Sequence, residues 1–410
     1  MANMKNIPDS LSPEQAWQRL SNLDRLPVEM KPLEDSLEHC LAEDFTAPQD
    51  VPSGNRSFMD GYAVRSQDVA NAPARLKLVG EVFMGEMLRQ TLGSGEAISI
   101  PTGGFMPQGS DAVVMQEDCE STNDGITVRR SVQPNENVQL RAEDFRAGER
   151  ISVGNRPLRA QDLAAMATFG VTKVKAYRKP KVAVISTGNE LVPYGSSTIE
   201  AAQIRETNSL ALVSAARHFG FEAQAEGIVL DVFELQREAL KHAMQTCDVI
   251  LVSGGSSVGA RDYTLNVIES FPGNKIHFHG LAIRPGNPTI AASIGSHVVF
   301  GLPGQPVSSL IVFYMLVLPC LFHLSGEQIH YPSFLATKFQ SRKVTLETSM
   351  NPLKTKTDYL RVRLTGSNAV PVPGKSASLS TLALADGFAV IPPGEKPVPA
   401  GSSIDVYLFP

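Results

Sequence analysis

Two near-continuous apolar runs lie in the middle of the chain, KVAVIS from residue 181 and DVILVSGG from residue 248. Such runs are typical of strands that are buried on both faces of a sheet. Between them, SLALVSAARHFG and FELQREALKHAMQ place apolar residues at helical spacing, and HFHGLAI and HVVFGLPG add further apolar runs. This alternation of strands and helices predicts an open, mainly parallel α/β sheet over residues 181–328.

Shorter β-like runs flank this region and predict additional domains. Residues 46–145 contain runs such as LKLVGEVF and ITVRRSV, separated by Gly, Pro and Asn, which indicates a small inserted β-rich module. Residues 329–410 contain DYLRVRL and SIDVYLF, which predict a C-terminal β-barrel or sandwich. Residues 1–45 and 146–180 would then form a discontinuous N-terminal linking domain. The expected class is a multi-domain protein of α/β plus β type.

Two helices are predicted individually. LSPEQAW begins one of them, because Ser12 can cap its N-terminus, Pro13 suits the first helical position and Gln15 completes a capping box. The other is the strongest apolar run, residues 310–322, which contains Pro319 and is too short to span a bilayer. We expect that run to form a helix in the protein core.

Composition narrows the range of partners. The chain has 37 Lys and Arg against 42 Asp and Glu, a net charge of −5, so no overall basic field attracts nucleic acid. The 4 cysteines are widely spaced without a CxxC pair, which suggests neither a zinc site nor a disulfide framework. The N-terminal segment is polar and lacks a secretory signal pattern. We therefore expect a cytoplasmic protein that binds neither nucleic acid nor membrane.

Three turns follow predicted strands of the α/β region and combine glycine with polar residues: 186–191, 253–262 and 301–309. Ligands bind beyond the carboxyl ends of strands in open α/β sheets. Glycines also allow the backbone to approach a phosphate closely. Each turn alone could be an ordinary strand-to-helix connection, but together they indicate an anion-binding edge. None matches the GxxxxGK[ST] pattern, and none has GxGxxG in the right context, which disfavours a standard nucleotide triphosphatase or dehydrogenase.

Three acids follow predicted strand ends, namely Glu190, Asp231 and Asp262. Carboxylates beside phosphate-binding loops commonly hold Mg²⁺, which bridges to phosphate oxygens. Helix capping is the alternative for each of them, and Asp231 is the weakest metal candidate. The sequence thus predicts an acid-lined phosphate site.

A family resemblance joins these segments. NRSFMDGYAVR (55–65), PTGGFMPQGSDAVVMQED (101–118), STGNEL, SGGSSVG..D and GLPGQPVS occur in the order found in the molybdopterin molybdotransferase family, of the MoeA and gephyrin E-domain type. The resemblance covers nearly the whole chain. It implies a homodimer whose active site is shared between subunits, and it implies insertion of molybdate into adenylylated molybdopterin with release of AMP, assisted by Mg²⁺. Molybdopterin adenylyltransferase is a candidate partner.

The resemblance also implies roles for individual residues. The expected catalytic residues are Asp60, Thr102, Glu190, Asp231 and Asp262. Glu190 and Asp262 would hold the metal. The expected substrate-binding residues are Ser253, Gly254, Gly255, Ser257, Arg284, Asn287, Ser308, Arg361 and Ser378. For the last two positions, Arg363 and Ser376 are the alternatives.

The chain departs from the family pattern in the segment IRPGNP, residues 283–288. The family usually has two lysines there, whereas this chain has Arg284 and the uncharged Asn287. Two functional classes therefore remain open. One is an active molybdotransferase with altered oxyanion handling, and the other is a repurposed, non-catalytic relative that binds a pterin, a nucleotide or a protein on the same scaffold.

Overall fold

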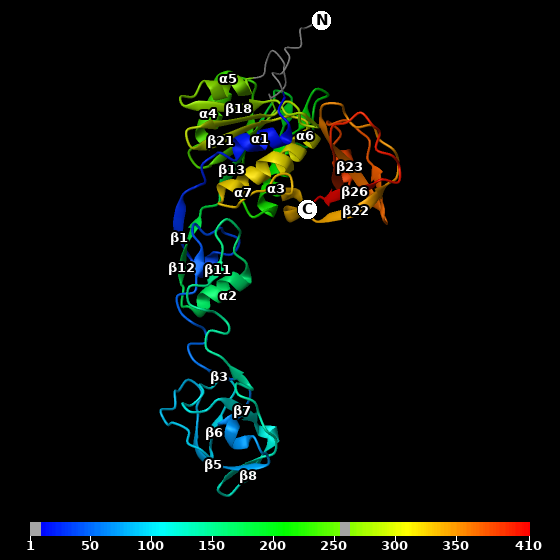
Figure 1. Ribbon diagram of the computed structural model, residues 1–410. Coiled ribbons are helices and arrows are strands. Elements are labelled where there is room, and N and C mark those ends of the chain that lie inside the picture. Colours follow the sequence, from blue (N-terminus) through cyan, green and yellow to red (C-terminus); the bar gives the residue numbers. More distant parts are fainter. Residues whose placement is uncertain (1–9, 255–262) are drawn as a thin grey trace.

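The protein is elongated in a computed structural model that describes residues 10–254 and 263–410. An α/β domain and a C-terminal barrel lie side by side at one end, and a small β module lies at the other end (Figure 1). A narrow linking part connects the two ends. The multi-domain α/β plus β architecture is therefore as the sequence predicted.

The α/β domain is built on a six-stranded sheet with the order β16-β13-β17-β21-β20-β18. Its strands are β16 (Glu222–Val229), β13 (Lys181–Thr187), β17 (Val249–Ser253), β21 (His297–Leu302), β20 (Ile290–Ile294) and β18 (Asn274–His279). The first four strands are parallel, and the last two pair antiparallel at one edge. The carboxyl ends of β13, β17 and β21 therefore meet at the same edge of the sheet.

Helices cover both faces of this sheet, as the apolar strands require. α1 (Pro13–Leu20), α3 (Asn208–His218) and α6 (Pro306–Val312) cover one face and share a core cluster with Val182 and Val184 of β13. α4 (Phe233–Ala243) and α5 (Thr264–Glu269) pack on the other face, against Ala183 and Ile185. The alternation follows from the two-residue repeat of side chains along a strand. The predicted capping box of α1 is present, with Gln15 N donating to Ser12 Oγ at 3.2 Å.

The predicted core helix is longer than the apolar run suggested. It continues from α6 through a π-helical segment, η4 (Phe313–Val317), into α7 (Leu318–Leu324). Residues 306–324 are long and apolar enough to cross a membrane, but 83% of the most apolar window is buried inside the protein. The segment is therefore accounted for as a core helix.

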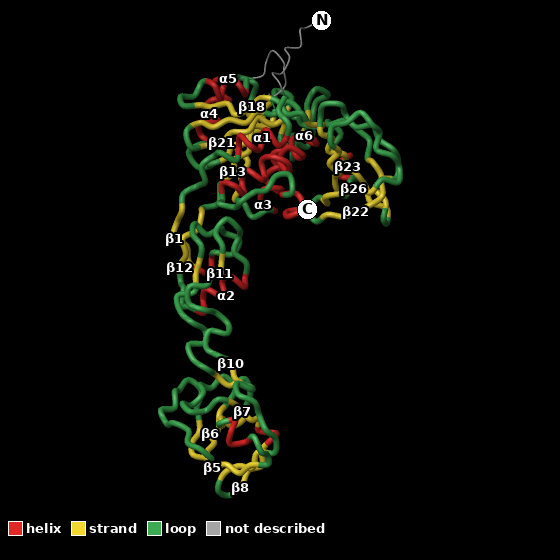
Figure 2. Tube along the Cα trace, in the orientation of Figure 1, coloured by secondary structure: helices red, strands yellow, loops and turns green. Residues whose placement is uncertain are grey.

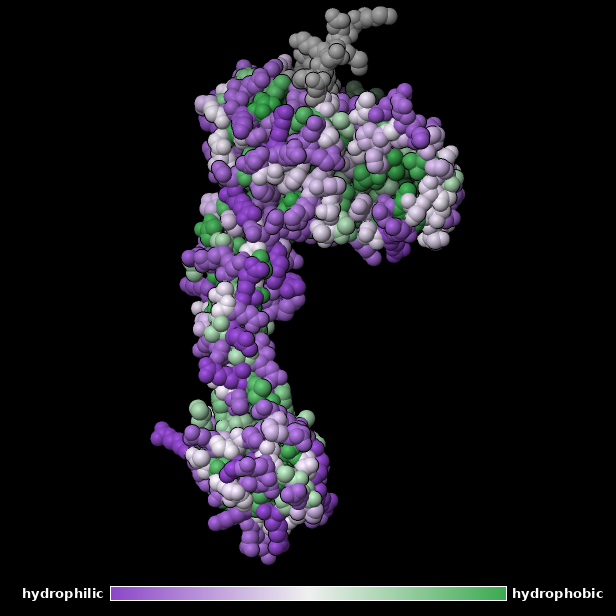
Figure 3. Space-filling view, viewed as in Figure 1, coloured by the Kyte–Doolittle hydropathy of each residue, from purple (hydrophilic) through white to green (hydrophobic). Residues whose placement is uncertain are grey.

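The linking part consists of short elements. β1 (Val28–Pro32) pairs antiparallel with β12 (Lys173–Tyr177), and β2 (Phe45–Thr46) pairs with β11 (Arg150–Ser152) beside α2 (Ala160–Thr168). The domain boundary expected between residues 45 and 46 falls inside β2. The space-filling view shows that hydrophilic residues cover much of this part (Figure 3).

The inserted module contains its own six-stranded sheet, with the order β7-β4-β6-β5-β9-β8. Its strands are β4 (Gly61–Val64), β5 (Ala74–Glu81), β6 (Glu96–Ile100), β7 (Ala112–Met115), β8 (Cys119–Thr122) and β9 (Gly125–Val128). Two further short strands, β3 (Arg56–Ser57) and β10 (Val138–Gln139), pair where the module joins the linking part. Strands and loops make up most of the module (Figure 2).

The C-terminal region is a closed barrel, which resolves the two alternatives from the sequence. Its strands are β22 (Ser341–Leu346), β23 (Thr357–Thr365), β24 (Asn368–Pro371), β25 (Gly387–Ile391) and β26 (Ser403–Leu408). A pairing between β23 and β25 closes the barrel. The barrel contacts the α/β domain through β19 (Ile283–Arg284), which pairs in parallel with the start of β23.

Candidate functional site

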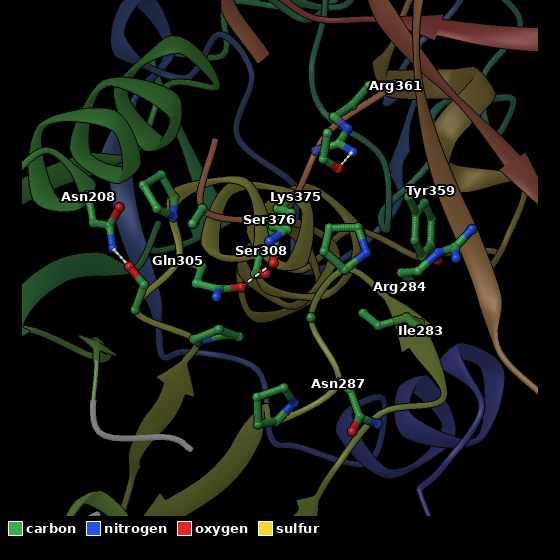
Figure 4. Close-up of a pocket in the computed structure, with 18 of the residues that line it drawn as sticks. Asn208, Ile283, Arg284, Asn287, Gln305, Ser308, Tyr359, Arg361, Lys375 and Ser376 are labelled. Carbon is green, nitrogen blue, oxygen red and sulfur yellow. Dashed lines mark hydrogen bonds between the residues drawn. The ribbon is translucent and has the colours of Figure 1, made fainter. Parts of the chain in front are cut away.

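A cleft of about 1540 Å³ lies between the carboxyl ends of the α/β strands and the barrel. Its α/β wall contains parts of all three turns that the sequence singled out, from Ser186, from Ser253 and from Pro303. The loop 283–288 forms its floor, and barrel residues 350–361 and 371–377 form the opposite wall. Figure 4 shows side chains from the two domains facing one another across this space.

The glycine after β17 shows why a small residue is required at the strand end. Gly254 has a φ of +110°, and a Cβ at this position would lie 2.3 Å from the carbonyl oxygen of Thr187. Any side chain would therefore clash with the neighbouring strand end. Asn208 Nδ2 donates to Ser253 Oγ at 2.7 Å and to Gly304 O at 2.8 Å, which ties together two of the turns. The expected substrate-binding residues Gly255 and Ser257 lie outside the described residues.

Two of the three expected acids line the cleft. Glu190 is exposed in the turn after β13, and Asp231 lies beyond the end of β16. Asp231 N donates to Asn189 Oδ1 at 3.0 Å, and Gln236 Nε2 donates to Asp231 Oδ1 at 3.3 Å. Asp262 lies outside the described residues. Carboxylate oxygens suit Mg²⁺ that is bound partly by substrate phosphates, although residues 10–254 and 263–410 contain no cluster of three metal-ligating side chains.

The loop that departs from the family pattern commits both of its polar side chains to contacts within the chain. Arg284 forms a forked ion pair with Asp358, in which Nε donates to Oδ1 at 3.1 Å and Nη2 donates to Oδ2. Hydrogen bonding to Asp358 raises the pKa of the Arg284 guanidinium. Asn287 Nδ2 donates to Leu281 O and to Ser10 Oγ, the latter at 3.2 Å. The loop therefore adds little uncompensated positive charge to the cleft.

The candidates on the barrel wall differ in where they lie. Arg361 lines the cleft, and its Nη1 and Nη2 donate to Thr381 Oγ1 and Gly374 O, each at 2.9 Å. Burial lowers the pKa of its guanidinium. Arg363 is exposed and lies away from the cleft lining. Ser376 lines the cleft, whereas the favoured candidate Ser378 does not.

Ser376 also joins the two walls of the cleft. Its Oγ donates to Oε1 of Gln305, and its carbonyl oxygen accepts from Val307 N at 3.2 Å. Gln305 precedes α6, and Ser308, on the first turn of that helix, lines the cleft with only 3% of its surface exposed. Gln305, Ser308 and Ser376 lie close together in Figure 4.

Several cleft residues were missed by the sequence reasoning. Lys354, Lys356 and Lys375 project from loops of the barrel wall, and Lys354 Nζ lies 3.6 Å from Glu395 Oε1 at an exposed rim. Glu206 was also missed. It is 5% exposed and accepts from Ser186 Oγ at 2.9 Å and from Ser209 N at 2.7 Å, so it holds the start of α3. The lysines in KTK and PGKS carried a charge signal but no strand or helix pattern to place them.

Asp60 and Thr102 lie together, but in the inserted module and away from this cleft (Figure 1). Asp60 Oδ1 accepts from Thr102 N at 2.6 Å and from Thr102 Oγ1 at 2.9 Å. These hydrogen bonds hold the pKa of the Asp60 carboxyl below its usual range. Exposed apolar side chains, Phe58 and Met59, precede Asp60. The chain therefore brings Asp60 and Thr102 together but does not place them at its own cleft.

The α/β domain with its strand-end cleft belongs to a class of molybdopterin-binding domains. Its residues 183–323 match the family model described as "Probable molybdopterin binding domain". Residues 11–170 match "MoeA N-terminal region (domain I and II)", and residues 343–409 match "MoeA C-terminal region (domain IV)". The chain belongs to the MoeA family.

Relatives of similar length support this assignment. The chain is similar to the "Molybdopterin molybdenumtransferase" of Staphylococcus epidermidis, with 32% identity over 92% of this chain and 90% of that protein. It is 30% identical to the protein of the same name from Staphylococcus aureus, over 96% and 94% of the two chains. A solved MoeA protein of Pyrococcus horikosii superposes with a TM-score of 0.82 at 34% identity, covering 98% of this chain and 99% of that one.

Proposed function

We propose that this chain is a molybdopterin molybdotransferase that inserts molybdate into adenylylated molybdopterin and releases AMP. The observation that carries the proposal is the arrangement of charge in one cleft. Glu190 and Asp231 lie on the α/β wall, while Arg361 and Lys375 lie on the barrel wall. A substrate that combines a phosphoanhydride with a separate oxyanion suits such a divided site, because the acids can hold a metal against the phosphates and the cations can bind the oxyanion.

The chain's own residues would share the work as follows. Ser253 and Gly254 line the cleft at the end of β17, where a phosphate group would bind. Glu190 and, from the family resemblance, Asp262 would hold Mg²⁺, which would neutralise charge on the phosphates when bound, and Asp231 lines the same wall of the cleft. Arg361 lies on the barrel wall and Ser308 lies on the first turn of α6, and molybdate would bind between them as a substrate. This arrangement orients the two reactants toward each other.

The shared active site remains part of the proposal. We infer that Asp60 and Thr102 act at the cleft of a second subunit, because their own cleft is distant (Figure 1). The exposed Phe58 and Met59 beside them suit a surface that is covered in a homodimer. We further propose a cytoplasmic location and molybdopterin adenylyltransferase as the supplier of the substrate.

The decisive experiment supplies purified protein with adenylylated molybdopterin, molybdate and Mg²⁺ and measures the AMP released. Asp231→Asn should lose most of this release while its unfolding transition stays close to that of the parent, because Asp231 is only partly buried. Asp405→Asn, on the far strand β26, is a matched control that should retain the release. A repurposed relative would bind the pterin but release no AMP in any of the three proteins.

A further inference from the structure

We propose that Lys375 supplies the oxyanion-binding positive charge that the loop 283–288 lacks in this chain. The inference rests on the proposed function, since it places molybdate in the cleft. It concerns a residue from the C-terminal barrel rather than from the α/β domain.

Neither polar residue of the loop is available to an oxyanion in the way that a free lysine would be. The Arg284 guanidinium is paired with the carboxylate of Asp358, whose side chain is only 5% exposed. The net charge of this pair is therefore close to zero. Asn287 carries no charge, and its amide donates to Leu281 O and Ser10 Oγ. A dianion in the cleft therefore needs positive charge from another element.

Lys375 is placed to provide it. The residue lines the cleft on the loop between β24 and α9 (Ser380–Ala383), and it directly precedes Ser376. The two contacts that Ser376 makes, with Gln305 and Val307, hold this loop against the first turn of α6, where Ser308 lies. Figure 4 shows Lys375 beside Ser376 and Ser308.

The charge on Lys375 is also uncompensated in the part of the chain that the structure describes. No carboxylate there lies within 4.0 Å of its Nζ, whereas Lys354 on the same wall has Glu395 Oε1 at 3.6 Å. A lysine ammonium is a compact charge on a flexible stem, so it can reach an oxyanion without a fixed geometry. The buried Ser308 hydroxyl and the Arg361 guanidinium would complete the contacts.

The test compares Lys375→Gln with Lys375→Arg and with Lys354→Gln, all in the full-length protein. Sodium molybdate is titrated at constant ionic strength. One readout is the rise in unfolding temperature on binding, and the other is the molybdate concentration for half-maximal insertion. Lys375→Gln should need roughly tenfold more molybdate in both readouts, the size expected when one charge-assisted contact is lost at a partly exposed position. Lys375→Arg should recover most of the loss, and Lys354→Gln should match the parent.

The two readouts separate the fate of this inference from that of the proposed function. If the parent inserts molybdate and Lys375→Gln titrates like the parent, Lys375 has no such role and the enzyme assignment stands. If Lys354→Gln shifts as much as Lys375→Gln, a general field acts and the specific contact is refuted. If the parent binds molybdate without inserting it and Lys375→Gln weakens that binding, the inference stands and the proposed function fails. If the parent neither binds nor inserts molybdate, both fail.

Discussion

Arg284 and Asp358 are partners in two senses, because they are register neighbours on β19 and β23 and their side chains form a forked ion pair. The pair joins the α/β domain to the barrel at the floor of the cleft. Asp358 is nearly buried, while the Arg284 side chain is 52% exposed. The same arginine that sequence reasoning assigned to substrate thus also holds two domains together.

Asp358→Asn is expected to destabilise the protein by about 1–2 kcal/mol, because it removes a charge-assisted fork but leaves an arginine that water can still reach. Urea unfolding at neutral pH measures this cost. Glu395→Gln is the matched control, because its pair with Lys354 is 79% and 80% exposed, and it should change stability by less than about 0.5 kcal/mol. Equal losses of unfolding free energy in the two variants would show that the Arg284–Asp358 pair stabilises the protein no more than an exposed ion pair does.

Asn287→Lys is expected to lower the free energy of unfolding without tightening molybdate binding. The family pattern alone suggests the opposite, namely that a restored lysine would strengthen oxyanion binding. In the structure, however, the amide holds the loop to Leu281 and Ser10, and a lysine cannot reproduce both contacts. The loss should be about 1 kcal/mol in unfolding free energy. Asn287→Ala removes the same bonds without adding a charge, so tighter molybdate binding by Asn287→Lys than by Asn287→Ala would contradict this expectation.

Mixing two inactive variants is expected to restore activity if Asp60 serves a second subunit. Asp60→Ala damages the module, and Asp231→Asn damages the cleft. Half of the dimers in an exchanged equimolar mixture contain one of each, and each of these has one intact site, so roughly a quarter of the parent activity should return. AMP release before and after subunit exchange measures it. Two copies of Asp60→Ala carrying different tags provide the control and should stay inactive. An active monomer would contradict the shared site.

Asp162 gives the linking part a pH-dependent contribution to stability. It is 5% exposed at the start of α2 and accepts from Arg156 Nη1 and Nη2, each at 2.7 Å, so the pKa of its carboxyl lies well below its usual range. A lowered folded-state pKa stabilises the protein above the unfolded-state pKa, about 3.9, and this stabilisation is lost as the pH falls through the folded-state pKa. Asp162→Asn should therefore cost about 2 kcal/mol between pH 5 and 7, and less below pH 4.

Denaturant unfolding of the parent and Asp162→Asn at pH 7, 5 and 3.5 measures this pH dependence. Asp118→Asn is a control from the far module, whose carboxylate has a more exposed ion pair with Arg130. A difference in unfolding free energy between the parent and Asp162→Asn that grows as the pH falls would contradict this prediction.

The sequence predicted best those features that follow from local patterns. The two strands buried on both faces, β13 and β17, and the capping box at Ser12 belong to this class, because each depends on residues close together in the chain. The three turns at one edge also follow, since parallel strands bring their carboxyl ends together.

Contacts between distant segments could not be predicted in this way. Asp358 pairs with Arg284 across 74 residues, and no periodicity in the sequence signals such a pair. That Ser376 and not Ser378 lines the cleft depends on how one barrel loop meets α6, and a shift of two residues leaves the strand pattern unchanged. The lysines of the barrel wall were missed for the same reason, because only the closed barrel places their loops at the cleft.

The core helix at residues 306–324 has a consequence for synthesis of the chain. Its Tyr314 packs against Phe339 at 5.4 Å and against Phe409 at 5.9 Å between ring centroids, so its cover includes residues that the ribosome makes well after the helix. At ordinary elongation rates, on the order of 10 s pass between synthesis of the helix and synthesis of the later of these aromatic residues. During that interval the nascent chain exposes an apolar segment long enough to cross a membrane. A ribosome that stalls in the barrel region would leave that segment uncovered and open to chaperones, insertion machinery or aggregation.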